Sequence, residues 1–466
     1  MTGRDPQLVY QAGGLGNELA SEAVPGALPI GQNSPQAPPL GLYTEQISGT
    51  AFTALRAQNR RTWLYKMRPS AKHRRFARIG NGLLRSAPFN EVDTPPDRFR
   101  WDPLPMPAAG TDFIDGLVTL AGNGDAAMRK GAALHIYCAN RSMQDRYFFD
   151  ADGELMIVPQ LGELLLCTEL GKLAVAPGEF AVIPRGVKFR AEIIAPRDGP
   201  AAQARGFVCE NYGAHFRLPE LGVIGANGLA GAYDFAAPVA AYEDGEQQVE
   251  VIAKMLGNLW SSRWEHSPLD TVAWRGNYAP YKYDLKSFMA INTVSFDHCD
   301  PSVHTVLTSP SGEPGAANVD FVVFPPRWLV ADHTFRPPWF HRNAMSEFVG
   351  LLRGASEVRA AGSPPGSAYL HNCMSAHGPD YGVFQKASRE ELKPHYLEGS
   401  LAVMWESLYV LRPTRYAMET PTLQQDYDSI WDGFGRQFGR PLRPEPSPSS
   451  EEPTTFPGFG TLAGEA

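Results

Sequence analysis

Residues 132–193 read AALHIYCANRSMQDRYFFDADGELMIVPQLGELLLCTELGKLAVAPGEFAVIPRGVKFRAEI. Short runs of aliphatic, aromatic and β-branched residues alternate here with turn pairs that end in glycine, at Asp152-Gly153, Leu161-Gly162, Leu170-Gly171, Pro177-Gly178 and Arg185-Gly186. Turns that recur every seven to nine residues are typical of antiparallel strands packed as a sandwich or jelly roll. The stretch therefore predicts a β domain with few helices.

The composition of the whole chain agrees with a mainly β protein. Its 466 residues include 45 glycines and 41 prolines, which favour turns over long helices. The net charge of −8 disfavours nucleic-acid binding, which needs a basic surface. No apolar run is long enough to span a membrane, and the first residues lack the pattern of a signal peptide. Five widely spaced cysteines without a CxxC motif favour reduced thiols, so we expect a cytoplasmic protein.

A second strand-rich block occupies residues 287–405 and includes the runs FMAINTVSFDH, NVDFVVFP and LAVMW. Further on, Thr420 and Pro421 predict the start of a helix, whose apolar face would carry Leu423, Tyr427, Ile430, Trp431 and Phe434. We expect an N-terminal β domain with a proline-rich arm, a C-terminal β domain and a disordered tail, with bounds of 1–283, 284–436 and 437–466.

The histidines are concentrated in the second block. Six of the eleven lie within one stretch of 80 residues in this block, at positions 298, 304, 333, 341, 371 and 377. His341 and Glu347 are six residues apart, and His371 and His377 repeat that spacing. Because side chains alternate between the two faces of a strand, residues six apart on one strand point to the same face. Two imidazoles and a carboxylate on adjoining strands form a ligand set that suits Fe(II). The alternative interpretation is that these polar side chains simply face water.

Two glycine-rich segments could suggest a phosphate-binding loop. GGLGNE, at 13–18, and IGANGLAG, at 224–231, match neither a dinucleotide-binding motif nor a Walker loop between a strand and a helix. Backbone turns explain these glycines better. The sequence also lacks the GxSxG and HExxH patterns, which excludes the commonest hydrolase signatures.

Several longer strings are specific enough to compare with known families. They are YQAGGLGNELASEAVPGALPIGQNSPQ (10–36), GNYAPYKYDLKSFMAINTVSFDHCDPSVHTVLTSP (276–310), FPPRWLVADHTFRPPWFHRNAMSEFVGLLRG (324–354) and LHNCMSAHGPD (370–380). Together they closely resemble the homogentisate 1,2-dioxygenase family, and the similarity extends from about residue 7 to about residue 431. The resemblance implies a cupin-like fold, with a large N-terminal β domain and a smaller C-terminal domain that holds iron.

The resemblance also implies roles for individual residues. Matched string by string, the iron ligands of the family fall on His341, Glu347 and His377, and His377 also binds substrate. The acid–base histidine of the family's FDH-x-DPS string falls on His298. His371 falls on a further histidine of the active site, which we expect to support the ligands from behind.

One position departs from the pattern of the family. Nine residues after the glutamate ligand the family has a tyrosine that contacts substrate, and this chain has Ser356. Serine keeps a hydroxyl but lacks the ring, so the volume and the hydrogen bonding of the substrate pocket both change. The substitution therefore bears on the identity of the substrate more than on the iron chemistry.

The N-terminal half carries a motif that looks like half of a second metal site. Gly178-x5-Pro184-x-Gly186 resembles the second cupin motif, and Phe189 stands where a cupin would place a metal-binding histidine. A phenyl ring cannot ligate a metal. We therefore expect this half to be a cupin without a metal, serving as a scaffold.

These correspondences imply an Fe(II)-dependent dioxygenase that opens homogentisate to 4-maleylacetoacetate in tyrosine and phenylalanine catabolism. Ser356 motivates a second hypothesis, a related enzyme that opens gentisate or another substituted hydroquinone. A third is a non-catalytic cupin with a binding or structural role, which the intact ligand residues disfavour. The expected partners are a small aromatic substrate and O2, with neither nucleic acid nor membrane, in a homo-oligomer that is a trimer or a hexamer.

Overall fold

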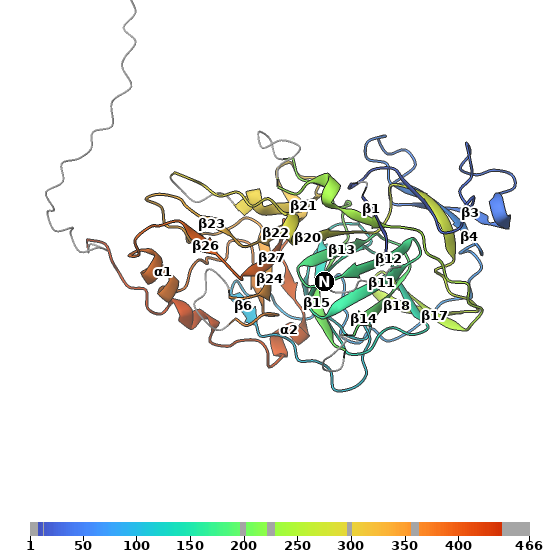
Figure 1. The fold of residues 1–466 in the computed structure, drawn as a ribbon. Helices are drawn as coiled ribbons and strands as arrows, with labels where there is room; N and C mark the ends of the chain where they lie inside the picture. Colours follow the sequence, from blue (N-terminus) through green and yellow to red (C-terminus); the bar gives the residue numbers. More distant parts are fainter. Residues whose placement is uncertain are drawn as a thin grey trace, which may run out of the picture.

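The computed structural model describes residues 8–12, 14–195, 202–220, 229–295, 301–355 and 363–439 (Figure 1). Strands make up 39% of these residues and helices 7%, so the prediction of a mainly β protein is confirmed. The α-helices of the described chain are α1 (Tyr381–Ala387) and α2 (Arg415–Glu419). None of the helices in these ranges is long and apolar enough to cross a membrane.

The N-terminal half contains two large sheets that pack face to face. Within the described ranges the larger sheet has the strand order β1 (Tyr10–Ala12), β16 (Ala236–Pro238), β20 (Tyr281–Asp284), β13 (Glu179–Ile183), β10 (Glu154–Leu161), β15 (Ala204–Asn211), β8 (Ala132–Ala139), β7 (Leu117–Gly122) and β28 (Arg412–Pro413). The second sheet has the order β12 (Gly171–Val175), β11 (Glu163–Thr168), β14 (Phe189–Ile194), β9 (Arg146–Asp150), β17 (Val249–Met255), β18 (Asn258–Trp264) and β5 (Ala77–Arg78).

Each of the five glycine turn pairs that the sequence predicted lies at the junction of two consecutive strands in the run from β9 to β14, with Leu161 ending β10 and Gly171 beginning β12. A third sheet flanks this sandwich and has the order β2 (Leu19–Glu22), β19 (Thr271–Gly276), β4 (Arg61–Lys66) and β3 (Tyr43–Ser48). The proline-rich arm, 25–41, is loop apart from a single 3₁₀ turn at Pro39–Gly41, because proline cannot donate ladder hydrogen bonds.

The C-terminal half is built on one sheet with the order β21 (Thr305–Pro310), β22 (Ala317–Phe324), β27 (Leu401–Ser407), β24 (Ser346–Arg353), β25 (Ala368–His371) and β6 (Arg98–Trp101). A small ribbon of β23 (Arg327–Leu329) and β26 (His395–Leu397) lies beside it. The predicted runs NVDFVVFP and LAVMW correspond to β22 and β27.

The two halves exchange strands. β6 comes before most strands of the N-terminal sandwich in the sequence, yet it pairs with β25, and in Figure 1 it lies in light blue among the orange C-terminal strands. In the other direction, β28 comes from the end of the chain and pairs with β7 of the N-terminal sheet. Each half therefore completes a sheet of the other.

One apolar core runs through both halves. The ring of Phe180 from β13 lies 5.0 Å from that of Phe321 in β22, and the ring of Phe207 in β15 lies 6.2 Å from that of Trp405 in β27. Gly350 permits this approach, because a Cβ there would lie 2.8 Å from the Phe207 ring. The C-terminal sheet is thus held against the sandwich by buried aromatic contacts.

Phe189 lies at the centre of the N-terminal sandwich. Its side chain is fully buried, and its ring meets those of Phe113 and Phe148 edge to face, with centroids 6.0 and 5.8 Å apart. The position at which the cupin motif would place a metal-binding histidine is therefore filled by aromatic packing.

Two predictions of local structure are wrong. The described part of FMAINTVSFDH, 288–295, contains no strand. No α-helix begins at Thr420, because residues 422–424 run extended along β6 and exchange backbone hydrogen bonds with Arg100 and Asp102. The helix of this region is α2, which Thr414 caps, and the later apolar residues form a 3₁₀ turn at Tyr427–Trp431. The predicted tail, 437–466, lies outside the described residues from position 440 onward.

Candidate metal centre

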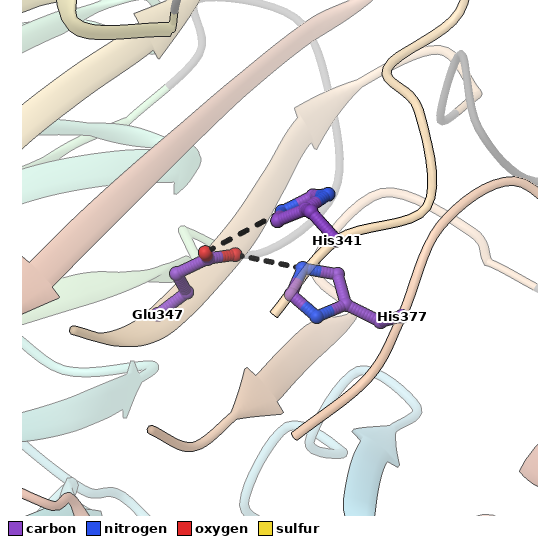
Figure 2. A group of neighbouring side chains, drawn as sticks. All are labelled: His341, Glu347 and His377. Atoms are coloured by element: carbon purple, nitrogen blue, oxygen red, sulfur yellow. Dashed lines mark hydrogen bonds and ion pairs between the residues drawn. The ribbon is translucent and has the colours of Figure 1, made fainter. Parts of the chain in front are cut away.

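Two histidines and a glutamate meet at the end of the C-terminal sheet. Glu347 is the second residue of β24, and its carboxylate points between His341 and His377 (Figure 2). The backbones of the two histidines form an isolated antiparallel bridge. The His341 N–H donates to the His377 carbonyl at 2.9 Å, and the His377 N–H donates to the His341 carbonyl at 3.1 Å. This bridge sets the two imidazoles side by side, with ring centroids 4.1 Å apart.

The distances within this group are those of converging ligands. Glu347 Oε1 lies 3.7 Å from His341 Nε2, and Glu347 Oε2 lies 3.0 Å from His377 Nε2. One potential ligand atom can be chosen from each of the three residues so that these atoms all lie within 4.8 Å of one another. Glu347 and His377 are buried, whereas His341 is half-buried. The group therefore opens toward solvent on the side of His341.

The geometry that brings the three residues together differs from the predicted one. The prediction placed His341 and Glu347 on one strand, but β24 begins at Ser346, and His341 lies before a turn. His371 ends β25, and another turn separates it from His377. The six-residue spacing therefore spans a turn in each case, and the two histidines meet across the bridge between these turns.

The histidine rings are oriented by backbone carbonyls. His341 Nδ1 lies 2.8 Å from the Trp339 carbonyl, and His377 Nδ1 lies 2.9 Å from the Ser375 carbonyl. A carbonyl oxygen can only accept, so Nδ1 is the donor in both rings. Each Nε2 is consequently the nitrogen that faces the carboxylate. Metal-binding histidines commonly have their second nitrogen held in this way.

The Glu347 carboxylate is held by an amide. Asn343 Nδ2 donates to Glu347 Oε1 at 2.8 Å and to Glu406 Oε1 at 2.7 Å, and Glu406 is the neighbour of Glu347 across the β24–β27 ladder. Burial alone would raise the pKa of Glu347, but its hydrogen bonds with His341 and His377 hold that pKa well below the usual range. The carboxylate is therefore ionised at neutral pH.

His371 lies directly behind the ligand group. Its ring stacks on that of His377 at 4.0 Å, its Nδ1 is 3.9 Å from Glu347 Oε2, and its Nε2 is 3.1 Å from the Tyr427 hydroxyl. The guanidinium of Arg100 from β6 lies over the Tyr427 ring at 4.5 Å. The strand exchanged from the N-terminal half thus supports the group from behind.

Two of the predicted site residues fall outside the part of the chain that the structure describes. His298 and Ser356 lie outside the described residues, so their predicted roles stay predictions. Sequence reasoning missed Asn343, although it stands two positions after His341. It also assigned Tyr427 to the apolar face of a helix. A single asparagine carries no periodic signal, so the register of β24 against β27 was needed to reveal its role.

The donor set fits a divalent transition-metal ion. Once a bound metal replaces the proton on each Nε2, two neutral imidazoles and one ionised carboxylate would leave further coordination positions open, and this arrangement suits Fe(II). The half-buried side at His341 gives small molecules a way to reach those positions. No described cysteine is among these ligand atoms, and zinc sites built on thiolates are accordingly a poorer match.

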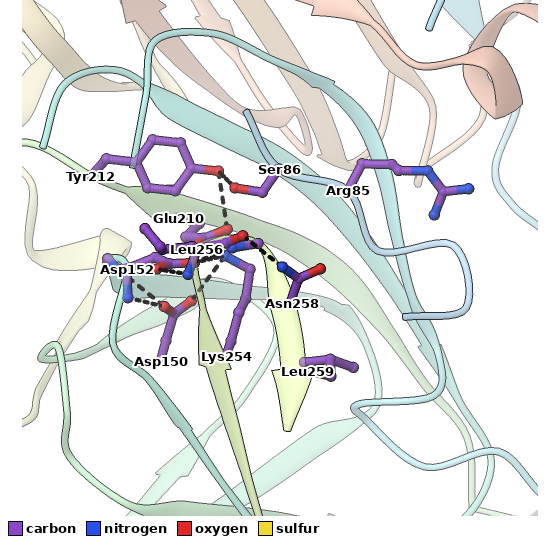
Figure 3. Close-up of polar contacts among 12 residues, drawn as sticks. Arg85, Ser86, Asp150, Asp152, Glu210, Tyr212, Lys254, Leu256, Asn258 and Leu259 are labelled. Carbon is purple, nitrogen blue, oxygen red and sulfur yellow. Dashed lines mark hydrogen bonds and ion pairs between the residues drawn. The ribbon is translucent and has the colours of Figure 1, made fainter. Parts of the chain in front are cut away.

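A second group of acidic side chains lies in the N-terminal sandwich and already holds a cation. Asp150, Asp152 and Glu210 are all buried, and Figure 3 shows them gathered around the Lys254 side chain. Lys254 Nζ lies 2.8 Å from Asp152 Oδ2 and 4.0 Å from Asp150 Oδ2, and it also donates to Glu210. Burial alone would lower the pKa of Lys254, but these carboxylates raise it well above its usual value. The ammonium therefore occupies the position that a metal ion would need.

Solved structures similar to the chain include proteins of the cupin type. A putative dioxygenase from Nostoc punctiforme is 11% identical, with 71% of this chain and 87% of that one covered and a TM-score of 0.29. A single-residue mutant of Bacillus subtilis oxalate decarboxylase is 11% identical, with coverage of 68% and 80% and a TM-score of 0.26. Protein YlbA from Escherichia coli is 8% identical, with coverage of 68% and 94% and a TM-score of 0.29.

Comparison with family models covers nearly the whole chain. The model of the N-terminal region of homogentisate 1,2-dioxygenase matches residues 9–285. The model of the C-terminal region of the same family matches residues 286–438, which include the three converging side chains. The chain therefore belongs to the homogentisate 1,2-dioxygenase family.

Proposed function

We propose that this protein is an Fe(II)-dependent dioxygenase that opens the ring of homogentisate to give 4-maleylacetoacetate, a step of tyrosine and phenylalanine catabolism. The observation that supports this most directly is the convergence of His341, Glu347 and His377 in a chain of this family. In the proposal these three residues hold the iron. Bound Fe(II) would supply Lewis acidity and would pass electrons from the substrate ring to O2.

The chain's own residues then have separate tasks. The Trp339 and Ser375 carbonyls keep each Nε2 directed at the metal, and Asn343 keeps Glu347 in place. A phenol ionises near pH 10, so at neutral pH a base must take the proton of the ring hydroxyl. In the proposal His298 takes that proton and later returns it, because an imidazole with a pKa near 6.5 can do both.

Oxygen uptake tests the proposed substrate. The protein is loaded anaerobically with Fe(II), mixed with homogentisate, gentisate or hydroquinone, and exposed to O2 in an oxygen electrode. We expect the fastest uptake with homogentisate and a product that carries both oxygen atoms. Faster uptake with gentisate or hydroquinone would support the related ring-opening enzyme instead. No uptake with any of the three, in protein that retains its iron, would support the non-catalytic cupin.

His298 is expected to move a proton without holding the metal. His298→Ala should therefore retain iron while kcat falls by about 10²- to 10⁴-fold, the usual range for general acid–base catalysis. His371→Ala is the control, since His371 stacks on His377 and should change iron affinity by about ten- to a hundredfold. If His298→Ala leaves kcat at neutral pH unchanged, His298 has no catalytic role.

Ser356 is expected to set substrate preference. A tyrosine at this position could reach the substrate with its hydroxyl, whereas serine withdraws that group, and the lost contact costs about 1–3 kcal/mol. Ser356→Tyr should then lower KM for homogentisate by roughly five- to a hundredfold and raise KM for an analogue with a bulkier ring substituent. Steady-state oxygen uptake measures both constants. Unchanged KM for both compounds would mean that residue 356 does not touch the substrate.

A further inference from the structure

The segment that follows α2 runs along β6 toward the metal centre, and we call its residues 422–431 the C-terminal strap. Residues 422–424 exchange backbone hydrogen bonds with β6, and the Gln424 side chain accepts from Arg100 Nε. The strap then forms the 3₁₀ turn Tyr427–Trp431, which packs against β6 as well. Tyr427 is only 2% exposed, so its side chain is shielded from water.

Two arginines of β6 hold this turn through its aromatic rings. The guanidinium of Arg98 lies 4.1 Å from the centre of the Trp431 ring, and that of Arg100 lies 4.5 Å from the centre of the Tyr427 ring. Arg98 also pairs with Asp428 at 2.6 Å. Residues two apart on a strand point to the same face, so β6 presents both guanidiniums to the turn. Cation–π contacts of this kind are strongest where water is excluded, as at Tyr427.

The same elements hold the backbone that carries His377. Arg98 Nη1 donates to the Ala376 carbonyl at 3.2 Å, and Trp431 Nε1 donates to the Pro379 carbonyl at 3.1 Å. These two carbonyls come just before and shortly after His377 in the sequence. The strap and β6 therefore fix the chain on both sides of a proposed iron ligand.

Tyr427 and Glu347 face different nitrogens of the His371 ring. The Tyr427 hydroxyl lies 3.1 Å from His371 Nε2, whereas His371 Nδ1 lies 3.9 Å from Glu347 Oε2. In a neutral imidazole one nitrogen donates and the other accepts, and an ionised carboxylate can only accept. The ring proton is therefore favoured on Nδ1, on the side of the carboxylate. Nε2 is then the acceptor, and a tyrosine hydroxyl can donate to it.

We propose that Tyr427 is a positioning residue of the metal centre, because its hydroxyl donates to His371 Nε2 and so keeps the ring proton on Nδ1, toward Glu347. This inference rests on the proposed iron site. Asn343 Nδ2 donates to Glu347 Oε1, and the His371 N–H adds a favourable partial charge on the side of Oε2. Each carboxylate oxygen then has an N–H of its own, which keeps the carboxylate turned between the two imidazole ligands. Tyr427 acts through His371 and does not itself touch the metal.

A double-mutant cycle on iron affinity tests the proposal, with anaerobic Fe(II) titration against a competing chelator as the measurement. Tyr427→Phe removes the hydroxyl but keeps the ring beside Arg100, and it should weaken Fe(II) binding by about tenfold. In the His371→Ala background the same change should have no further effect, because the hydroxyl has lost the group through which it acts. Tyr283→Phe is the matched control. Its hydroxyl is buried in the N-terminal half without a partner in the described structure, so the Fe(II) Kd should not change.

The ring nitrogens of His371 provide a second readout, which a purely structural role of Tyr427 would not change. In metal-free protein labelled with ¹⁵N-histidine, the NMR signals of His371 are those absent from His371→Ala. We expect a protonated Nδ1 and an unprotonated Nε2 that accepts a hydrogen bond. In Tyr427→Phe the ring should become a mixture of both tautomers. A proton on Nε2 in the unsubstituted protein would overturn the proposal, as would an equal loss of iron affinity in both backgrounds of the cycle.

Neither measurement uses a substrate or O2, so this inference and the proposed function can fail separately. If the unsubstituted chain binds Fe(II) and Tyr427→Phe binds it equally well, only the inference about Tyr427 fails. If the unsubstituted chain binds no Fe(II), both fail. A circular-dichroism spectrum and an unfolding midpoint for each variant show that a weaker site is not a lost fold.

Discussion

Glu347→Gln should leave the protein folded but with little iron and no measurable oxygen uptake. Glutamine has nearly the same shape, and its amide oxygen can still accept from Asn343, so the local hydrogen bonding survives. A neutral amide is, however, a far poorer ligand for a divalent cation than a carboxylate is. Metal analysis after iron loading should therefore show a small fraction of the roughly one iron per chain expected for a single site.

Glu406→Gln is the matched control. Glu406 shares the Asn343 amide with Glu347 and faces it across the ladder, but it does not belong to the three converging residues. Its neutral variant should retain most of the iron and most of the activity. If Glu347→Gln binds a normal amount of iron, or if both variants lose it equally, Glu347 is not the carboxylate ligand.

Lys254→Met should destabilise the protein by about 3–5 kcal/mol, the usual cost of removing one partner of a buried ion pair. Lys254 is 1% exposed, and its ammonium pairs with the buried carboxylates of Asp152 and Glu210, while burial and Glu210 raise the pKa of Asp150 well above its usual value. Methionine fills much of the same volume but leaves these groups without a counter-charge. Because a domain has only about 5–15 kcal/mol of stability in total, the loss is large. Urea unfolding followed by fluorescence measures it.

An exposed lysine provides the comparison for this variant. Lys393 pairs with Glu391 at 2.8 Å, but both side chains are more than two-thirds exposed, at 71% and 78%. Surface pairs of this kind contribute little to stability, so Lys393→Met should leave the urea midpoint unchanged. Equal midpoints for Lys254→Met and the unsubstituted protein would show that the buried carboxylates bind protons instead of relying on the ammonium.

The strands of the N-terminal sandwich could be predicted from the sequence because their signals are local. A glycine turn and a run of apolar residues on either side of it lie within a few positions of each other, as at Asp152-Gly153 between β9 and β10. Predictions failed where a distant partner decides the conformation. Residues 422–424 have a helical pattern, but pairing with β6 makes them extended, and β6 lies more than 300 positions earlier.

The three converging residues of the candidate metal centre could also be predicted from local sequence, but the way in which they meet could not. The resemblance of HRNAMSE and LHNCMSAHG to family strings selected His341, Glu347 and His377. The physical argument from strand periodicity pointed to the same residues together with His371, but it assumed the wrong local geometry. Neither argument found Asn343, because its role depends on the register that places Glu347 opposite Glu406.

The exchange of β6 and β28 between the two halves affects how the chain folds during its synthesis. When the N-terminal half emerges from the ribosome, β6 has no strand to pair with. Its partner is β25, in which Leu370 lies opposite Phe99, and β25 has not yet been synthesised. β7 likewise waits for Arg412 and Pro413 to complete its sheet. Contacts so distant in sequence form slowly, and an exposed strand edge can pair with other chains in the meantime. We expect nascent chains that stop before β25 to aggregate or to recruit chaperones, whereas chains released after β28 can close both sheets in one concerted step.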